Sequence, residues 1–393
     1  MTMQQVRAEE WIERAKKIGE IAAAEADEAD RNGRFSDRVA QAIKDTEIQK
    51  LVRPRKYGGH SQTPRLFAEV IRTVGRYNLS GGWLTYFYPI HEIWVGYLHP
   101  EGREEIFHDG GLVADVIAPV GRAERDGSGY RVYGRWNFAS GVLWSEWIGL
   151  GAIAERPEGS APEPMLFAVR VSELGIIENW DTLGLRATAS HGVEANGVWV
   201  PDRRVLPYAE VFAGKPIGGE MDDDEPSYRV PFMPYFGFGF VPLALAGAER
   251  LVEIFQERTE KRVRAYEGGA KEVEKREKQR LLGTFKAQLD AANALFERYL
   301  DQLDAWMQEG RTAISEAERN RMFAWRAQTI EMCADLARKV MNALGGSALY
   351  KGDPAERFVR DILMLSSHAA HQYEDAMWAY GATSLGLAGH PVW

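Results

Sequence analysis

Three histidines have the residue type and the spacing that proton-transfer chemistry would use. His368 and His371 lie three residues apart in a helical pattern near the end of the chain, and His91 lies in the aromatic segment 82–98. Histidine can donate or accept a proton near neutral pH. Residues three apart share one face of a helix, so both members of the pair would reach the same site. The pattern predicts acid–base chemistry, and a core histidine bonded to its neighbours is the alternative for each.

Two other kinds of site are disfavoured. A zinc ion would need a third ligand besides His368 and His371, and the sequence suggests none. A G-x-G-x-x-G turn after a strand, as in nicotinamide-binding Rossmann domains, is also missing. The sequence therefore predicts neither a metal centre nor a site for a nicotinamide dinucleotide.

The segment 231–240, PFMPYFGFGF, has the most unusual composition in the chain. It holds five aromatic side chains within ten residues. Such a surface suits a flat or apolar substrate, and Tyr235, Phe236 and Phe238 are the candidate contacts. A packed corner at the start of a helical domain is the alternative.

Composition and charge exclude several classes of protein. The net charge of −9 and the lack of a basic tail disfavour nucleic-acid binding. No apolar run approaches the roughly 18 residues that span a bilayer. The amphipathic start of the chain lacks the apolar core of a signal peptide, and the single cysteine, Cys333, cannot form an internal disulfide. We expect a cytoplasmic protein with neither membrane nor nucleic-acid partners.

The elements that must position these residues fall in three consecutive parts. Residues 1–110 show apolar positions at spacings of three and four, which are typical of helices. Residues 111–206 hold short alternating runs bounded by Gly, Pro and Asp, which predict a small antiparallel β-domain. Residues 207–393 predict a C-terminal four-helix bundle. The expected fold class is α+β, mostly α, and the bundle segments are 238–265, 272–308, 314–343 and 355–387.

That order resembles the acyl-CoA dehydrogenase superfamily, and three local stretches match the family residue by residue. They are GRWNFASG at 134–141, WDTLGLRATAS at 180–190, and the segment 345–361. In the dehydrogenases the catalytic base is a glutamate eight residues after the Arg-Asp pair of the last stretch. Here that position is Ala369, and His368 stands beside it. The resemblance implies a flavin protein whose dehydrogenase chemistry has been replaced.

Within the superfamily, the chain is more similar to the oxygenase components of two-component (group D) flavin-dependent monooxygenases. These include p-hydroxyphenylacetate and secosteroid phenol hydroxylases and dibenzothiophene monooxygenase. They share the W-x-F/W-x-S-G pattern of the flavin strand, and they carry histidines at positions that match His91 and His368. Ala187 and Ala189 depart from the family's GLRGTGS turn, where glycine is common.

The resemblance assigns roles to individual residues. Phe138 would pack near the flavin ring, Ser140 would face its N5 atom, and His368 on the final helix would lie over the C4a–N5 edge. His91 would lie on the substrate side and accept a proton from a phenol or amine, with His371 beside the substrate. The further cofactor contacts that it implies are Trp136, Arg186, Ser190, Arg264 and Gly346.

The implied reaction is oxygenation of an aromatic or heteroatom-containing small molecule by reduced FMN or FAD and O2, through a C4a-hydroperoxyflavin. The flavin carries the hard chemistry, and the protein supplies orientation and a dry pocket. A separate NAD(P)H-flavin reductase would deliver the reduced flavin, and the family is usually a homotetramer. The resemblance does not decide whether the substrate is a phenol, a thiophene or an amine.

Two alternatives are weaker. An acyl-CoA dehydrogenase or a nitroalkane-oxidase-like oxidase needs a carboxylate base at position 369 or on the preceding bundle helix. The sequence has Ala369 at the first place and no Asp or Glu between Arg229 and Ala248 at the second. A non-enzymatic helical-bundle protein that binds no flavin is the second alternative.

Overall fold

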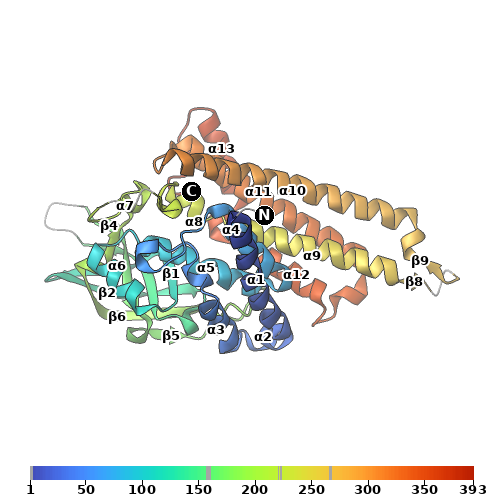
Figure 1. Ribbon diagram of the computed structural model, residues 1–393, viewed down its shortest axis with the longest axis horizontal. Coiled ribbons are helices and arrows are strands. Elements are labelled where there is room, and N and C mark those ends of the chain that lie inside the picture. The colour runs from blue at the N-terminus through green and yellow to red at the C-terminus, as the bar shows by residue number, and fades with distance from the viewer. Residues whose placement is uncertain (1–2, 156–160, 220, 222–223, 265–267) are drawn as a thin grey trace.

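A β-sheet lies at one end of an elongated molecule, a long helical bundle extends to the other end, and the N-terminal helices lie between them (Figure 1). The computed structural model describes residues 3–155, 161–219, 221, 224–264 and 268–393. Among the helices of these residues, none combines the length and the apolar character that a membrane span requires.

Six helices form the described N-terminal part, and side-chain caps set the starts of three of them. Ser36, Thr63 and Asn78 accept backbone N–H groups at the first turns of α3, α4 and α5. α5 is buried on nearly all sides because almost all of its residues are apolar or aromatic, and it carries His91. The helices are α1 (Met3–Ala24), α2 (Ala26–Asn32), α3 (Asp37–Asp45), α4 (Pro64–Tyr77), α5 (Leu79–Val95) and α6 (Pro100–Asp109).

Among the described residues, seven strands form one sheet in the order β5-β6-β2-β1-β3-β4-β7. The prediction of an antiparallel domain is wrong for one pair, because β1 and β3 run parallel. β2 folds back on β1 as a hairpin, and β3 then lies along the opposite edge of β1. The strands are β1 (Val113–Asp126), β2 (Gly129–Ala139), β3 (Trp147–Ala154), β4 (Glu163–Arg170), β5 (Gly175–Ile177), β6 (His191–Pro201) and β7 (Val205–Pro207).

The C-terminal part is a bundle in which α11 contacts α9, α10 and α12 (Figure 1). α13 packs back on α11. A short hairpin of β8 (Val263–Arg264) and β9 (Ala270–Lys271) joins α9 to α10 at the far tip of the bundle. The helices are α7 (Tyr208–Phe212), α8 (Phe232–Phe236), α9 (Phe240–Lys261), α10 (Arg276–Glu309), α11 (Glu316–Leu344), α12 (Pro354–Ser366) and α13 (Tyr373–Ser384).

The prediction of one continuous helix over 355–387 is wrong. A short 3-10 turn, η10 (Ala369–His371), separates α12 from α13. The hydroxyl of Ser367 donates back to the carbonyl of Leu363 at 3.0 Å, which offers the chain an alternative to helix at this point. His368 has an extended backbone and caps η10. It therefore lies on a turn and not on the final helix.

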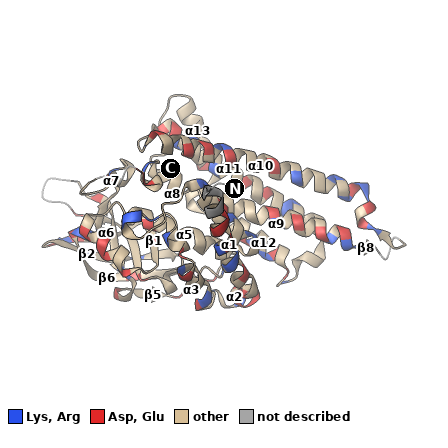
Figure 2. Ribbon diagram, viewed as in Figure 1, with Lys and Arg blue, Asp and Glu red and all other residues tan. Residues whose placement is uncertain are grey.

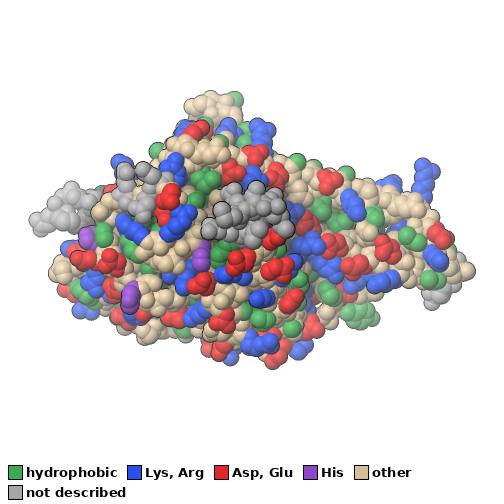
Figure 3. Space-filling view, in the orientation of Figure 1, with side chains coloured by type: hydrophobic (Ala, Val, Ile, Leu, Met, Phe, Trp, Pro, Cys, Tyr) green, Lys and Arg blue, Asp and Glu red, His purple; other side chains and the backbone are tan. Residues whose placement is uncertain are grey.

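Charged residues are spread over the whole molecule. Acidic and basic residues are mixed along the bundle helices (Figure 2), and their side chains are interspersed over the face shown in Figure 3. A mixture of this kind produces no broad positive field on that face.

Candidate active site

His368 lies in an aromatic cluster built from several elements. Its ring centroid lies 4.7 Å from Phe240 of α9, 5.8 Å from Trp83 of α5 and 5.4 Å from His371. The two imidazole planes differ by only 17°. The H-x-x-H spacing therefore does bring the two rings together, but through a turn and not through a shared helix face.

Hydrogen bonds indicate which nitrogen of each ring carries the proton. Nδ1 of His368 accepts the N–H of Ala370 at 3.1 Å, so the neutral ring is protonated on Nε2. Nε2 of His371 faces the Leu365 carbonyl, which only accepts, so Nδ1 of this ring is bare and has no partner. Burial and then the charge of Arg326 lower the pKa of His368 to about 4. Burial lowers the pKa of His371 well below its ordinary value, and both rings are neutral at pH 7.

Ser140, just after β2, is connected to this cluster through Trp83. The indole N–H of Trp83 donates to the Ser140 hydroxyl at 3.0 Å. The Ser140 oxygen lies 2.7 Å from the Ser190 hydroxyl, which lies 2.7 Å from the Thr188 hydroxyl. All three side chains are buried. The hydroxyl chain joins the end of β2 to the turn before β6, and Trp83 joins both to His368.

A bulge changes the direction of the end of β2. The pairing of β2 with β6 shifts register between Trp136 and Ala139, and Phe138 takes a left-handed backbone with φ 69°. Residues other than glycine rarely adopt that conformation, and bulges redirect side chains. The Phe138 side chain is 64% exposed and lies 6.0 Å from the ring of Trp180. An aromatic surface is thus held open two residues before Ser140.

The turn between β5 and β6 is strained and is held by α12. Leu185 and Ala189 both have left-handed backbones, with φ of 51° and 47°. The carboxylate of Asp361 accepts the N–H of Leu185 at 2.6 Å. A Cβ on Gly184 would lie 2.4 Å from the carbonyl of Arg360, so only glycine fits there. The Arg-Asp pair of α12 therefore seats this turn against the bundle.

His91 lies on the same aromatic wall as His368. Phe87 approaches the His91 ring edge-on at 4.9 Å, and Phe236 lies nearly parallel to it at 6.1 Å. Phe87 also packs on Phe240 at 5.8 Å, and Phe240 contacts His368. One continuous set of rings therefore runs from His91 to His368.

The other two candidate wall residues face the core. Tyr235 and Phe238 are buried and pack on each other with ring centroids 5.2 Å apart. Phe238 also packs on Phe67 at 5.5 Å. The structure brings Phe236 to His91, whereas Tyr235 and Phe238 pack on the core side of the wall.

Three predicted cofactor contacts, Trp136, Arg186 and Gly346, lie apart from this cluster. Trp136 is buried in the core of the β-sheet, where its indole N–H donates to a backbone carbonyl at 2.7 Å. Arg186 is engaged within its own chain, with an ion pair to Asp181 at 2.7 Å. Gly346 is exposed at the start of the turn after α11. The side chain of Arg264 lies outside the described part of the structure.

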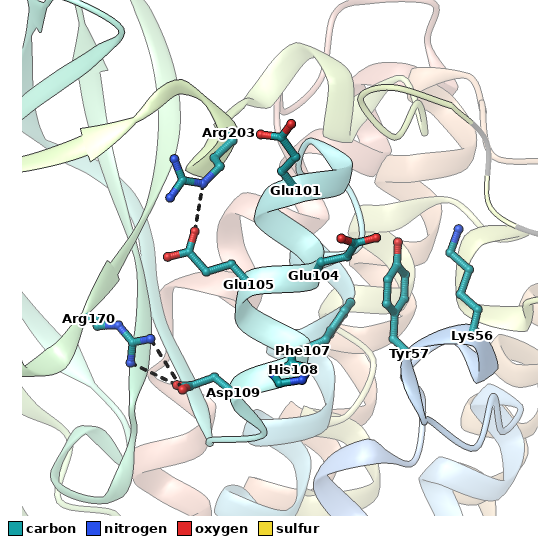
Figure 4. A pocket seen from close by; sticks show the side chains of 10 residues that line it. All are labelled: Lys56, Tyr57, Glu101, Glu104, Glu105, Phe107, His108, Asp109, Arg170 and Arg203. Atoms are coloured by element: carbon teal, nitrogen blue, oxygen red, sulfur yellow. Dashed lines mark hydrogen bonds and ion pairs between the residues drawn. The ribbon is translucent and has the colours of Figure 1, made fainter.

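A separate groove lies beside α6 (Figure 4). Its volume is about 850 Å³. Ion pairs of Arg170 with Asp109 at 3.1 Å and of Arg203 with Glu105 at 3.0 Å join α6 to the β-domain along it. None of the residues of the histidine cluster lines this groove, so its carboxylates take no part in the candidate site.

Comparisons with known proteins identify the family that has this arrangement. A family model described as acyl-CoA dehydrogenase, C-terminal domain, matches residues 238–373. The structure of XiaF from Streptomyces sp. in complex with FADH2 and glycerol superposes with a TM-score of 0.90, over 99% of this chain and 98% of that chain, at 24% identity. Residues 238–373 therefore match the acyl-CoA dehydrogenase family, and the whole chain has the fold of this flavin-bound structure.

Relatives that match nearly the whole chain are named as hydroxylases or oxygenase components. A pigment production hydroxylase of Rhodococcus sp. is 28% identical over 385 residues, covering 96% of this chain and 97% of the relative. The oxygenase component of p-hydroxyphenylacetate 3-hydroxylase from Acinetobacter baumannii is 24% identical, with 97% and 90% covered. TdsC, a dibenzothiophene monooxygenase of Paenibacillus sp. solved with FMN and indole, superposes with a TM-score of 0.79 at 18% identity, with 96% and 97% covered. The predicted fold and the predicted class, a flavin-dependent monooxygenase, are confirmed.

The residues of the candidate site fit a flavin ring. A flat ring with polar edges needs an open aromatic face and hydrogen-bonding groups close to it. Phe138 would supply the face, because its left-handed backbone at the bulge leaves the ring exposed. Ser140 follows two residues later, and the Nε2–H of His368 has no acceptor among the described residues. These three residues are the ones that would hold the ring.

Two residues of the candidate site, Trp83 and Asp115, were not predicted from the sequence. Trp83 connects Ser140 to His368, and its position in an aromatic helix gave no sign of that hydrogen bond. Asp115 lies against His91. A signal for Asp115 was present, because it is a charged residue inside the apolar strand sequence LVADVIA.

Proposed function

We propose that this monooxygenase oxygenates a flat aromatic or heteroatom-containing molecule, with Ser140 and His368 on the flavin side and His91 and Phe236 on the substrate side. The observation that carries the proposal is Trp83, which donates to Ser140 at 3.0 Å and contacts the His368 ring at 5.8 Å. Relatives named for p-hydroxyphenylacetate, resorcinol and dibenzothiophene support a flat substrate. Phenols, thiophenes and amines are the candidate substrates.

The residues of this chain have separate tasks in that function. Reduced flavin, when bound, supplies the activated oxygen. Ser140 presents an oriented hydroxyl to the ring, since Trp83 and Ser190 fix its oxygen. His368 donates from Nε2 as a neutral ring at pH 7, because its pKa lies near 4. The aromatic wall between His368 and His91 excludes water from the reacting atoms.

We propose that a separate NAD(P)H-dependent flavin reductase supplies reduced FMN or FAD to this chain. Support comes from relatives that are oxygenase components, one of them named as FADH2-dependent. The chain itself lacks the glycine-rich turn of a nicotinamide site. A coupled assay tests this supply and the choice of flavin. The protein is mixed with a flavin reductase, NADH and either FMN or FAD, and product formation is compared.

We further propose that the protein is a cytoplasmic homotetramer. Several large apolar side chains are exposed on the C-terminal part of the chain, and such patches mark subunit contacts. They are Leu349, Tyr350, Trp378, Leu385 and Leu387. Native mass spectrometry measures the assembly, and a monomer at micromolar concentration would contradict the proposal.

The main test replaces His368 with Asn. Asparagine can still cap η10, as His368 does, but it lacks the donor at the place of Nε2. Loss of an acid–base group costs about a hundredfold or more in rate. We expect product formed per reduced flavin oxidised to fall steeply, with hydrogen peroxide released instead.

His390→Asn is the matched control. His390 also accepts backbone N–H groups, of Val392 and Trp393, but its ring contacts Phe323 and not the aromatic wall. This variant should keep the ratio of product to peroxide. An unchanged ratio in His368→Asn would remove His368 from the reaction. The dehydrogenase alternative predicts no oxygenated product in any variant, because a dehydrogenase removes hydrogen from its substrate and inserts no oxygen atom.

A further inference from the structure

A buried arginine of α11 lies beside the turn that carries His368. Arg326 is only 2% exposed, and its Nη2 donates to the carbonyl of Ala370 in η10. Its Nε has no hydrogen-bond partner within the described residues, and no carboxylate among them forms an ion pair with this guanidinium. Arginine is almost never fully buried without a paired charge. A charged group that is buried in this way needs an explanation other than a salt bridge.

The fold leaves a space for the guanidinium of Arg326. A Cβ on Gly237 would lie 2.6 Å from Nη1 and 2.9 Å from Cζ of Arg326, so the arginine fills the volume that this glycine leaves free. The rings of Phe323 and Trp393 each lie 5.3 Å from Cζ. Aromatic faces attract a cation, most strongly where water is excluded. The glycine and the two rings therefore hold a positive charge inside the protein.

The backbone of Ala370 is bound by both Arg326 and His368. Its carbonyl accepts from Arg326, and its N–H donates to Nδ1 of His368 at 3.1 Å. The second bond requires that Nδ1 is bare. A proton added to the neutral His368 ring would occupy Nδ1 and break the cap of η10. The conformation of the turn therefore depends on the neutral state of the imidazole.

The charge of Arg326 favours that neutral state. Burial and then the charge of Arg326 lower the pKa of His368 to about 4, because a second positive charge close by is unfavourable. Burial and then His368 lower the pKa of His371, the other titratable group of η10. Burial raises the pKa of the phenols of Tyr86 on α5 and Tyr299 on α10, and the charge of Arg326 opposes that shift. These neighbours are neutral at pH 7, so none of them offsets the charge of Arg326.

We infer that Arg326 is a positioning residue, which holds η10 in place and keeps the His368 ring neutral with its proton on Nε2. The inference rests on the proposed function, in which that Nε2–H is the donor on the flavin side. Arg326 acts through Ala370 and His368 and not on the reacting atoms. A displacement of about 1 Å can cost about a hundredfold in rate, so the donor requires a turn of fixed geometry.

The test measures the protonation of His368 by NMR in the whole chain without flavin, prepared with isotope-labelled histidine. The signal that is missing from His368→Asn identifies the ring. At pH 7 the unmodified protein should show a single tautomer with the proton on Nε2. Arg326→Met removes the charge and the donor. At pH 5 this variant should raise the ratio of protonated to neutral His368 by about tenfold, which is one pKa unit.

Three more variants separate the charge from its surroundings. Arg326→Gln keeps a donor but lacks the charge, so it should give the same rise and decides the question if Arg326→Met folds poorly. Arg326→Lys keeps the charge and should leave the ratio as it is in the unmodified protein. Arg338→Met is the matched control, because Arg338 lies on the same helix but is exposed and paired with Glu331 and Asp335. It should leave the ratio unchanged.

A double-mutant cycle tests whether Arg326 acts through His368. With reduced flavin and O2, Arg326→Met should lower the product formed per flavin oxidised by about tenfold or more, but should cause no further loss in His368→Asn. Additive losses would show that Arg326 acts elsewhere and would overturn the inference. An unchanged ratio of protonated to neutral His368 in both Arg326→Met and Arg326→Gln would also overturn it.

Failure of the proposed function would be seen separately. It would be flavin oxidation by the unmodified protein with no oxygenated product from any substrate. The NMR measurement contains neither flavin nor substrate, so its result does not depend on that outcome.

Discussion

The indole N–H of Trp83 donates to the hydroxyl of Ser140 across 3.0 Å, and this bond joins the N-terminal helices to the end of β2. The Ser140 oxygen continues the connection to Ser190 at 2.7 Å. Because both partners are buried, the bond cannot be exchanged for one with water without structural change. The Ser140 hydroxyl, which the proposed function places at the flavin, therefore also connects the N-terminal helices to the end of β2.

Ser140→Ala should weaken both stability and flavin binding. The substitution leaves the Trp83 N–H buried without an acceptor, which costs about 1–3 kcal/mol of the free energy of unfolding. Urea denaturation measures the first effect, and anaerobic titration with reduced flavin measures the second. Ser145→Ala is the control, because the Ser145 hydroxyl is also buried but donates only to the Gly141 carbonyl at 3.0 Å. Equal flavin affinity in both variants would remove Ser140 from the flavin site.

Asp115→Asn should change how stability depends on pH. The pKa of Asp115 is raised by folding from 3.8 to about 8. A raised carboxyl binds more protons in the folded state, so its contribution to stability is complete below 3.8 and is lost as the pH rises through 8. Asparagine does not ionise, so the variant does not lose stability in this way as the pH rises. The free energy of unfolding of the variant, relative to the unmodified protein, should therefore increase over this range, by at most about 1.4 kcal/mol per pH unit.

The same experiment separates a neutral pair from an ionic one. If Asp115 were ionised against a protonated His91, folding would lower the carboxyl pKa and the trend would reverse. Urea denaturation at pH intervals between 3.8 and 8 gives the slope. Glu124→Gln, measured alongside, removes the general effect of losing a carboxylate from β1. A flat or falling difference would contradict the neutral pair.

The order of the elements could be predicted from sequence, because apolar spacing and turn residues are local properties of the chain. The strand that ends at Ala139 was predicted in the same way, and its W-x-F-x-S-G pattern marked it as the flavin strand. The parallel pairing of β1 with β3 was not predictable, since periodicity identifies strands but not their neighbours. Strands as short as β5 and β8 leave no periodic signal at all.

The candidate site was predicted in part for the same reason. The types of His91, His368 and Ser140 marked them as candidates, but their partners lie far away in the chain. Trp83 lies 57 residues before Ser140, and Asp115 meets His91 only because β1 passes α5 in the fold. The helix breaks at His368 where side chains form hydrogen bonds with the backbone. Such bonds are an alternative to the helix, but they leave only a weak signal in the sequence.

Phe138→Gly should separate flavin binding from stability. The left-handed backbone of Phe138, at φ 69°, costs about 1–2 kcal/mol for a residue with a side chain, and glycine avoids that cost. Glycine also lowers the free energy of unfolding by about 0.5–1 kcal/mol, because it gives the unfolded chain more conformational freedom. Since the ring is 64% exposed and packs on little besides Trp180, the free energy of unfolding should change little. Loss of an aromatic face should weaken flavin binding by on the order of 1.5–3 kcal/mol.

Ala189→Gly is the matched control for this last variant. Ala189 also has a left-handed backbone, at φ 47°, but it offers no ring and is buried. Its replacement by glycine should raise the free energy of unfolding or leave it unchanged, and should keep flavin affinity. Anaerobic fluorescence titrations with reduced FMN and reduced FAD measure both variants and show which flavin binds more tightly. If Phe138→Gly binds either flavin as tightly as Ala189→Gly does, the exposed ring serves another purpose, and the flavin lies elsewhere on the chain.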